Sequence, residues 1–200
     1  MMELVVGDCS TWSIRALMCL ALAEINVTER IIPLGQPGYE KTLSGVSDSM
    51  LVPVLIDGDT RIHDSLAIAE YANELSAGLL WPHDFNERGL ARSLVCELHS
   101  GFAQIRTLMP FSWIVSRPVD ISGAPAVQKE LRRLDAIWSQ AGSTFYFSAP
   151  SVVDAFYAVL AYRLNAYDVT LSGAAGRYQC ALLQWPLFNQ VVERAKRWAN

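Results

Sequence analysis

The chain has 200 residues, of which 52% are hydrophobic and 18% are charged, and its 16 basic and 20 acidic residues give a net charge of −4. This composition excludes a disordered chain, which would be poor in apolar residues and rich in net charge. The net acidity argues against nucleic-acid binding as the main activity, and the length suffices for one large domain or two small ones with a buried core.

The first 80 residues alternate between strand and helix patterns. Asp8, Ser10 and Thr11 favour a helix N-terminus, and apolar residues at helical spacing continue from Ile14 to Ile25. Asp64 and Ser65 open a second such helix. We predict the order β-α-β-α-β-β-α, with strands at residues 3–6, 28–34, 52–56 and 60–63, helices at 11–25 and 65–75, and one short helix within 39–50.

The second part of the chain is predicted to be entirely helical. Helices are expected at residues 86–108, 125–141, 151–167 and 187–198, and the third starts at the cap residue Ser151 and has an apolar body at 155–167. Residues 1–80 hold 11 acidic and 4 basic residues, a net charge of −7, whereas the other 120 residues have a net charge of +3. We therefore predict an α/β domain at 1–80 and an all-α domain at 85–200.

No segment fits a membrane span, because the apolar stretch 16–23 is far shorter than the ~20 residues that a span needs. The N-terminus lacks the basic region and the small-residue cleavage site of a signal peptide. The four cysteines form no CxxC pair and have no metal-ligand spacing, so we expect a cytoplasmic protein with free thiols and no metal site. They are Cys9, Cys19, Cys96 and Cys180.

Three segments carry residues suited to chemistry. Cys9, Ser10 and Thr11 stand where a strand meets a helix N-terminus, whose unpaired N–H groups stabilise an anion. A hydroxyl or thiol at this place can donate to the anion or react itself. Ordinary N-capping explains the same residues, and taken alone it is the simpler interpretation.

The other two segments are Val52-Pro53 and Asp64-Ser65. A proline cannot donate to a sheet ladder, so Pro53 indicates either an edge position or a cis bond that turns the backbone of Val52 toward a ligand. Asp64 and Ser65 precede a helix and can bind the ammonium and carboxylate groups of a ligand, although capping again explains them.

In this order and at this spacing, the three segments resemble the cytosolic glutathione S-transferases. Residues 10–15, Ser-Thr-Trp-Ser-Ile-Arg, are similar to the opening of the zeta class and its bacterial relatives, which use serine. Val52-Pro53 resembles the cis-proline strand of the thioredoxin-like domain, and residues 63–71 resemble the Glu/Gln-Ser motif and its helix. Residues 151–155 resemble the capping box of the buried helix in the all-helical domain.

The resemblance implies a thioredoxin-like domain, a helical bundle domain and a glutathione site. Ser10 would be the catalytic hydroxyl that donates to the glutathione sulfur, with Cys9 and Thr11 as alternates. Val52 and Pro53 would present backbone to the cysteinyl part of glutathione. Asp64 and Ser65 would hold the γ-glutamyl end. A homodimer is also implied.

Two departures from the family pattern affect the glutathione site. Relatives commonly carry Lys or Gln just before the Val-Pro pair, where this chain has Met50-Leu51, and Leu51 can form no ionic contact with the glycine carboxylate. Asp48 adds a carboxylate nearby. Losing one charge-assisted hydrogen bond costs about 1.5–3 kcal/mol, so either weak glutathione binding or a changed ligand specificity is expected.

The pocket for the second substrate is expected to use Trp12, His99, Phe102 and Arg106. The last three lie at i, i+3 and i+7, which places them on one face of the predicted helix 86–108. A structural histidine between the two domains explains His99 at least as well. Arg163 and Tyr167 also share a helix face, and they either reach the cleft or stabilise the bundle.

The favoured function is conjugation of glutathione to small hydrophobic electrophiles, as in detoxification. One alternative is a zeta-like, glutathione-dependent cis–trans isomerase of a dicarboxylate, for which the sequence indicates no basic pocket. The other alternative is a non-catalytic binding protein that has kept the fold.

Overall fold

The computed structural model describes residues 2–113, 118–142 and 144–199. The chain divides into two compact units: a sheet unit of Met1–Leu80 with Asn189–Asn200, and a helical unit of Trp81–Phe188. The predicted helical domain, 85–200, differs from this division because the last twelve residues group with the sheet unit.

The sheet unit contains a four-stranded sheet in the order β2-β1-β3-β4. The strands are β1 (Met2–Gly7), β2 (Val27–Ile32), β3 (Val54–Asp57) and β4 (Thr60–His63). Strand β1 runs parallel to β2 and antiparallel to β3, which pairs antiparallel with β4. This is the predicted thioredoxin-like arrangement, although β3 begins at Val54 because Pro53 cannot donate to the ladder.

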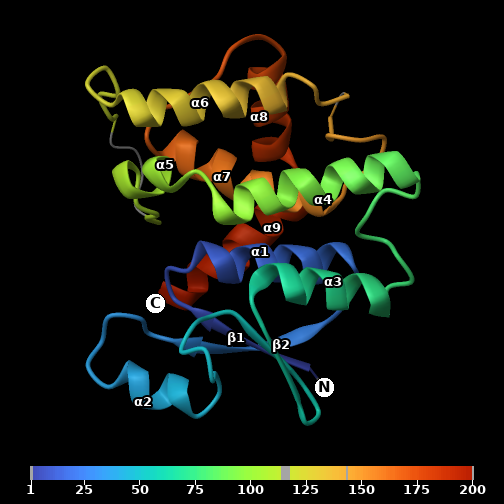
Figure 1. Ribbon diagram of the computed structural model, residues 1–200. Helices are drawn as coiled ribbons and strands as arrows, with labels where there is room; N and C mark the ends of the chain where they lie inside the picture. Colours follow the sequence, from blue (N-terminus) through green and yellow to red (C-terminus); the bar gives the residue numbers. More distant parts are fainter. Residues whose placement is uncertain (1, 114–117, 143, 200) are drawn as a thin grey trace. The chain divides into compact units, whose positions relative to one another are not determined.

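Helices cover both faces of this sheet (Figure 1). Helices α1 (Thr11–Leu22) and α3 (Ser65–Leu75) pack together on one face, and α2 (Tyr39–Ser44) lies on the other. Residues Val5, Ile32 and Val54 of the sheet form a buried apolar cluster with Leu43 and Val46. This packing fixes the strand ends from which the candidate site is built.

The helical unit is arranged around α7 (Val152–Ala166), which packs against α4 (Phe85–Ser100) and α8 (Gly173–Gln184). The predicted capping box is present at the start of α7, where the Asp154 carboxylate accepts from the Ser151 N–H at 2.8 Å. Tyr178 donates to the same carboxylate at 2.7 Å. Asp154 is completely buried, and these hydrogen bonds offset the cost of its burial.

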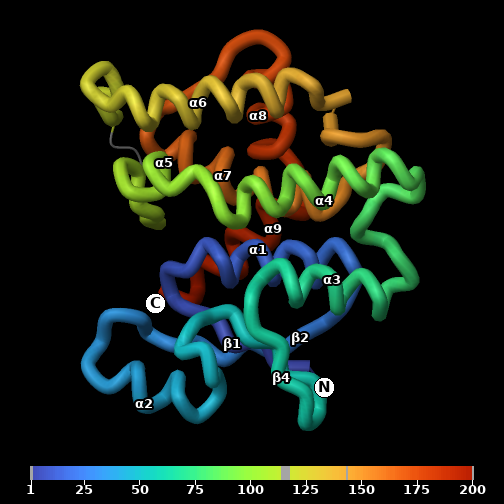
Figure 2. Tube along the Cα trace, in the orientation of Figure 1, coloured from blue at the N-terminus to red at the C-terminus, as the bar shows by residue number. Residues whose placement is uncertain are grey.

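Two predictions for the helical unit are wrong. Residues 86–108 form two helices, α4 (Phe85–Ser100) and α5 (Ala103–Leu108), because Phe102 adopts a left-handed conformation with φ of 57°. Figure 2 shows the change of direction between them. Helix α8 (Gly173–Gln184) was not predicted, since Gly173 and Gly176 lower helix propensity. Helix α6 spans Pro125–Trp138.

The chain ends with α9 (Pro186–Lys196) and a 3₁₀ turn at Arg197–Ala199. Arg194 forms an ion pair with Glu29 of β2 at 2.6 Å and donates to the Val27 carbonyl at 2.8 Å. The Trp198 indole N–H also donates to the Glu29 carboxylate at 3.1 Å. These contacts explain why residues 189–200 group with the sheet unit.

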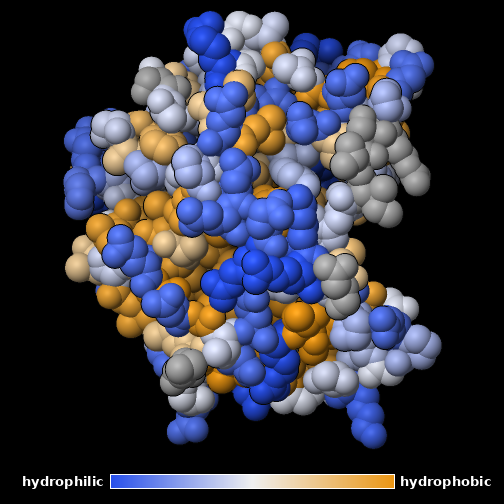
Figure 3. Space-filling view, turned by 180° about the vertical axis from the view of Figure 1, so that it is seen from behind, coloured by the Kyte–Doolittle hydropathy of each residue, from blue (hydrophilic) through white to orange (hydrophobic). Residues whose placement is uncertain are grey.

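Several large apolar side chains reach the surface, and Figure 3 shows hydrophobic and hydrophilic side chains interspersed on one face. The most exposed are Phe85 at 77% and Leu51 at 68%. In the described part of the chain, no helix combines the length and apolar character needed to cross a membrane. The described residues also contain no His, Cys, Asp and Glu group suited to a metal ion.

Candidate functional site

Strand pairing brings the three predicted segments of the glutathione site to one end of the sheet. Strand β1 ends near Ser10, and its antiparallel register pairs Val5 with Val54, directly after Pro53. The register of β3 with β4 pairs Val54 with His63, directly before Asp64. Helices α1 and α3 therefore begin at the same end of the sheet as the loop that carries Val52-Pro53.

Ser10 is the N-cap residue of α1. Its Oγ accepts a hydrogen bond from the Ser13 N–H at 3.2 Å, and the side chain is 8% exposed. A hydroxyl has one donor and two acceptor positions, and this cap uses one acceptor. Ser13 is completely buried and accepts from the Gly7 N–H at 3.2 Å, which is a structural role.

Cys9 and Thr11 flank Ser10 but differ from it in environment. The Cys9 residue reaches the surface, but the protein atoms around its thiol remove part of the solvent, and this desolvation together with the nearby Asp8 carboxylate raises the pKa of the thiol. A raised pKa leaves less reactive thiolate at neutral pH. Thr11 is buried in the first turn of α1, with 6% of its surface exposed.

Val52 and Pro53 form a cis peptide bond just before β3. The β1–β3 ladder ends at the Val5–Val54 pair, so Val52 lies beyond it. A Cβ at Gly7 would lie 3.0 Å from the Val52 side chain and would collide with Leu34. A side chain at position 7 would therefore require the Leu34 and Val52 side chains to shift, and glycine lets the Val52 loop lie close to the end of β1.

Asp64 and Ser65 form the N-terminus of α3. Asp64 has an unusual positive φ of 77°, and its carboxylate accepts from the N–H groups of Leu66 at 2.7 Å and Ala67 at 3.4 Å. Ser65 is 1% exposed, and its hydroxyl has no hydrogen-bond partner among the described residues. A buried hydroxyl without a partner costs free energy, and a backbone strained at φ above zero is frequent at ligand sites.

The loop before Val52 is held by Ser47, which is 3% exposed. Its hydroxyl donates to the Leu51 carbonyl at 2.8 Å and accepts from the Leu51 N–H at 3.3 Å. The side chains of Met50 and Leu51 point outward, at 40% and 68% exposure, and Asp48 is also exposed. This loop therefore presents no cation at the position where relatives commonly have one.

Trp12 lies on the first turn of α1 and is half-buried. The guanidinium carbon of Arg15 lies 4.6 Å from the centroid of its ring, an arrangement typical of a cation–π contact. Arg15 itself is 3% exposed. The Arg15 contact fixes one side of the indole.

The predicted shared face of His99, Phe102 and Arg106 is wrong, because the helix is interrupted between α4 and α5. His99 lies in the last turn of α4, Phe102 in the interruption, and Arg106 on α5. The Arg106 guanidinium donates to the carbonyls of Gly101 and Leu98, so it satisfies the C-terminal end of α4. Burial lowers the pKa of Arg106.

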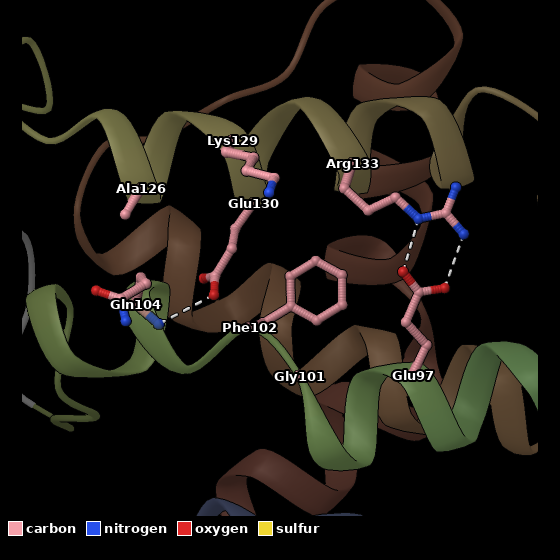
Figure 4. Close-up of a pocket in the computed structure, with 8 residues that line it drawn as sticks. All are labelled: Glu97, Gly101, Phe102, Gln104, Ala126, Lys129, Glu130 and Arg133. Atoms are coloured by element: carbon pink, nitrogen blue, oxygen red, sulfur yellow. Dashed lines mark hydrogen bonds and ion pairs between the residues drawn. The ribbon is translucent and has the colours of Figure 1, made fainter.

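Phe102 lines a pocket of about 370 Å³ between the α4–α5 junction and α6 (Figure 4). Its ring lies between two interactions that cross the pocket. Arg133 forms an ion pair with Glu97 at 2.6 Å, and Glu130 accepts from the Gln104 and Ile105 N–H groups at 3.1 and 2.8 Å. His99 and Arg106 are not among the described residues that line this pocket.

A further aromatic group lies near Arg163, and sequence patterns did not single out its members. Phe111 and Trp113 follow α5, and both rings pack against Tyr162 of α7. The density of aromatic residues at 111–113 is the one signal that could have indicated them.

The comparisons with known proteins agree with this geometry. Residues 9–75 match the family model described as the N-terminal domain of glutathione S-transferase. No curated protein is similar enough to this sequence to count as a match.

Solved structures resemble the whole chain. A tau class glutathione S-transferase from mango, Mangifera indica, has 17% identity and a TM-score of 0.75, covering 99% of this chain and 96% of its own. A glutathione transferase homolog from Burkholderia, with bound glutathione, has 22% identity and a TM-score of 0.73, covering 98% of both chains.

A diazinon-metabolizing glutathione S-transferase from the silkworm, Bombyx mori, has 17% identity and a TM-score of 0.78. The match covers 100% of this chain and 99% of the silkworm chain. The predicted fold class is thus confirmed: the chain has the glutathione S-transferase fold, a thioredoxin-like domain followed by a helical domain.

Proposed function

We propose that this protein is a glutathione transferase that joins the glutathione sulfur to small hydrophobic electrophiles. The observation that carries the proposal is the convergence of two helix N-termini and the Val52-Pro53 loop at one end of the sheet. Helix N-termini favour anions, and glutathione offers both carboxylates and a thiolate. The match of residues 9–75 to the family model supports the same substrate.

In this proposal Ser10 stabilises the thiolate. Its Oγ uses one acceptor position for the α1 cap, and its O–H donates to the glutathione sulfur. That hydrogen bond, with the N-terminus of α1, lowers the thiol pKa so that the thiolate forms at neutral pH. The thiolate then attacks the electrophilic carbon, a C–S bond forms, and the leaving group departs with its bonding electrons.

Val52, Asp64 and Ser65 bind the remainder of glutathione in this proposal. The backbone of Val52, beyond the end of the β1–β3 ladder, pairs with the cysteinyl backbone. The buried hydroxyl of Ser65 donates to the γ-glutamyl carboxylate, which supplies the partner that the described residues do not. Asp64 attracts the ammonium group of the same residue.

A second candidate is a non-catalytic binding protein, which the outward-facing Leu51 and the absence of a cation on residues 47–51 favour. We keep the transferase as the first candidate. The missing contact to the glycine carboxylate of glutathione weakens binding of the tripeptide but does not alter the residues proposed to bind its sulfur. We further propose a homodimer in the cytoplasm, where the free thiols of the chain stay reduced.

Calorimetric titration with glutathione and turnover of 1-chloro-2,4-dinitrobenzene test the proposal. The wild-type protein should bind millimolar glutathione and form the thioether with release of chloride. In Ser10→Ala, binding should persist while turnover falls and its pH dependence shifts upward, because the bound thiol regains a pKa near ~8.5.

Ser65→Ala should weaken glutathione binding, whereas Ser44→Ala, on the exposed face of α2, serves as the matched control. Failure of the wild-type protein to bind millimolar glutathione would refute both the transferase and any glutathione-binding role. Turnover that survives Ser10→Ala but not Cys9→Ala would move the catalytic role to Cys9.

A further inference from the structure

Ser47 is buried in the loop that joins α2 to Val52-Pro53, with 3% of its surface exposed. Its hydroxyl donates to the Leu51 carbonyl at 2.8 Å, accepts from the Leu51 N–H at 3.3 Å and lies 3.0 Å from the Ser49 Oγ. A hydroxyl has one donor and two acceptor positions, so Ser49 is the donor in the last contact and all three positions are used. One buried side chain therefore binds both polar backbone groups of Leu51, the residue before Val52.

Ser47 is itself held by the core of the sheet unit. Its N–H donates to the Leu43 carbonyl at 2.8 Å, and Leu43 and Val46 belong to the buried apolar cluster of this unit. Arg61 of β4 donates to the Gly45 carbonyl at 3.2 Å, which fixes the same segment from the side of the sheet. Ser47 therefore connects a fixed position in the core to the backbone of Leu51.

The backbone of Met50 indicates that hydrogen bonds impose the shape of this loop. Met50 has a φ of 56°, in the left-handed region that residues other than glycine rarely adopt. Its N–H donates to the Ser47 carbonyl at 3.2 Å, and its side chain is 40% exposed, so side-chain packing does little to enforce this conformation. A strained backbone persists only where surrounding contacts hold it, and Ser47 supplies such contacts through its carbonyl and its hydroxyl.

We propose that Ser47 is a positioning residue that holds the backbone of Val52 in place for the cysteinyl part of glutathione. The inference rests on the proposed function, in which Val52, beyond the β1–β3 ladder, binds that part of the tripeptide. Because Leu51 precedes Val52 in the chain, fixing both polar backbone groups of Leu51 restricts the orientations open to Val52. Glutathione then binds a loop that is already ordered, which lowers the entropic cost of binding. This prearrangement supports affinity on a loop that carries no cation at residues 47–51.

The first test measures the loop without glutathione. Ser47→Ala removes both hydrogen bonds to Leu51, so exchange of the Leu51 amide hydrogen, followed by NMR on the full-length protein, should become about tenfold faster. Ser49→Ala is the matched control, because it removes a hydroxyl from the same loop but leaves both bonds between Ser47 and Leu51. It should change the Leu51 rate by less than about twofold. An unchanged Leu51 rate in Ser47→Ala would overturn the proposal.

Steady-state kinetics with glutathione and 1-chloro-2,4-dinitrobenzene test the functional role. Ser47→Ala should raise the KM for glutathione, and its calorimetric Kd, about tenfold, because binding must now order the loop. The kcat and its pH dependence should be unchanged, because the bound loop is ordered and Ser10 is unaltered. A folding defect would instead lower the apparent kcat and leave KM as it was. A fall in kcat, or a shift of its pH profile, would overturn the positioning role.

Ser47→Thr keeps the hydroxyl that Ser47→Ala removes, so it is the conservative variant. Its KM for glutathione should lie within about threefold of the wild-type value, because threonine has the same donor and acceptor positions. Equally raised KM values in the threonine and alanine variants would show that the hydroxyl is not the group that matters, and would overturn the proposal.

The outcomes separate this inference from the proposed function. Wild-type protein that neither binds nor turns over millimolar glutathione refutes the proposed function and overturns this inference with it. Wild-type turnover with an unchanged KM in Ser47→Ala refutes the positioning role alone and leaves the transferase standing. A raised KM in Ser47→Ala, with nearly wild-type values in Ser49→Ala and Ser47→Thr, supports both.

Discussion

The guanidinium group of Arg194 lies 2.6 Å from the carboxylate of Glu29, an ion pair that ties the last helix of the chain to strand β2. Glu29 also accepts from the Trp198 indole, and its side chain is only 15% exposed. Removing the charge of Glu29 leaves both donors with a weaker acceptor. The C-terminal segment therefore contributes to the stability of the sheet unit.

Glu29→Gln should lower the free energy of unfolding by about 1–3 kcal/mol, because it breaks a partly buried, charge-assisted pair. Glu193→Gln is the matched control: Glu193 pairs with Lys196 at 2.6 Å, but its side chain is 66% exposed. That change should cost less than about 0.5 kcal/mol. Urea unfolding of both variants measures the difference, and equal losses would contradict the prediction.

Gly101 ends helix α4, and a Cβ at this position would lie 2.7 Å from the Glu97 carbonyl oxygen. Gly101→Ala should therefore lower the free energy of unfolding by about 1–3 kcal/mol, the usual cost of forcing a side chain into filled space. Gly89→Ala, in the same helix, meets open space and should raise stability by about 0.5–1 kcal/mol. Thermal unfolding distinguishes the two, and the same sign for both would contradict this account.

The thiol of Cys9 has a raised pKa because it is partly buried and because the Asp8 carboxylate is nearby. Its alkylation rate should reach half-maximum at a higher pH than that of an unperturbed cysteine, so little thiolate is present at neutral pH. Asp8→Asn should move that midpoint downward, since it removes the charge while keeping an acceptor for the Leu34 N–H. The variants carry Cys96→Ser and Cys180→Ser, because both of these thiols are exposed.

If the midpoint for Cys9 instead fell at or below the ordinary value, the thiol would be activated. In that case Cys9 would replace Ser10 as the group to test first. Thus the pH dependence of alkylation measures which of the two neighbouring residues is suited to catalysis.

Short sequence patterns were enough to predict the main features at the end of the sheet where the candidate site lies. Ser10 and Asp64 belong to residue types that favour helix N-caps, and both cap helices in the structure. Pro53 marked a special position, where the structure has the cis bond that the family resemblance implied. Each of these signals is contained within a few residues, so sequence patterns alone could indicate it.

Features that depend on distant contacts could not be predicted in this way. The ion pair of Arg194 with Glu29 joins residues far apart in the chain, and no pattern near either residue indicates it. The left-handed conformation of Phe102 could not be predicted from the sequence either, because an aromatic residue after a glycine is compatible with a continuous helix. The predicted common face of His99, Phe102 and Arg106 failed for this reason.

Leu51 gives the most direct test of how this chain departs from the common glutathione site. Its side chain is 68% exposed, and the two hydrogen bonds between its backbone and Ser47 hold it next to Val52. Leu51→Lys adds a cation without displacing any packed group, and the proposed site would place that cation near the glycine carboxylate of glutathione. The affinity for glutathione should increase about tenfold, the gain expected from one new charge-assisted hydrogen bond.

Leu79→Lys is the control, because Leu79 is 54% exposed in the same unit and the substitution changes the net charge equally. Calorimetric titration of the two variants then separates a local contact from the general effect of lowering the negative charge. An increase in glutathione affinity confined to Leu51→Lys supports glutathione as the ligand at this end of the sheet. Equal gains would attribute the effect to net charge, and no gain in either variant would mean that residue 51 does not face the glycine end of the tripeptide.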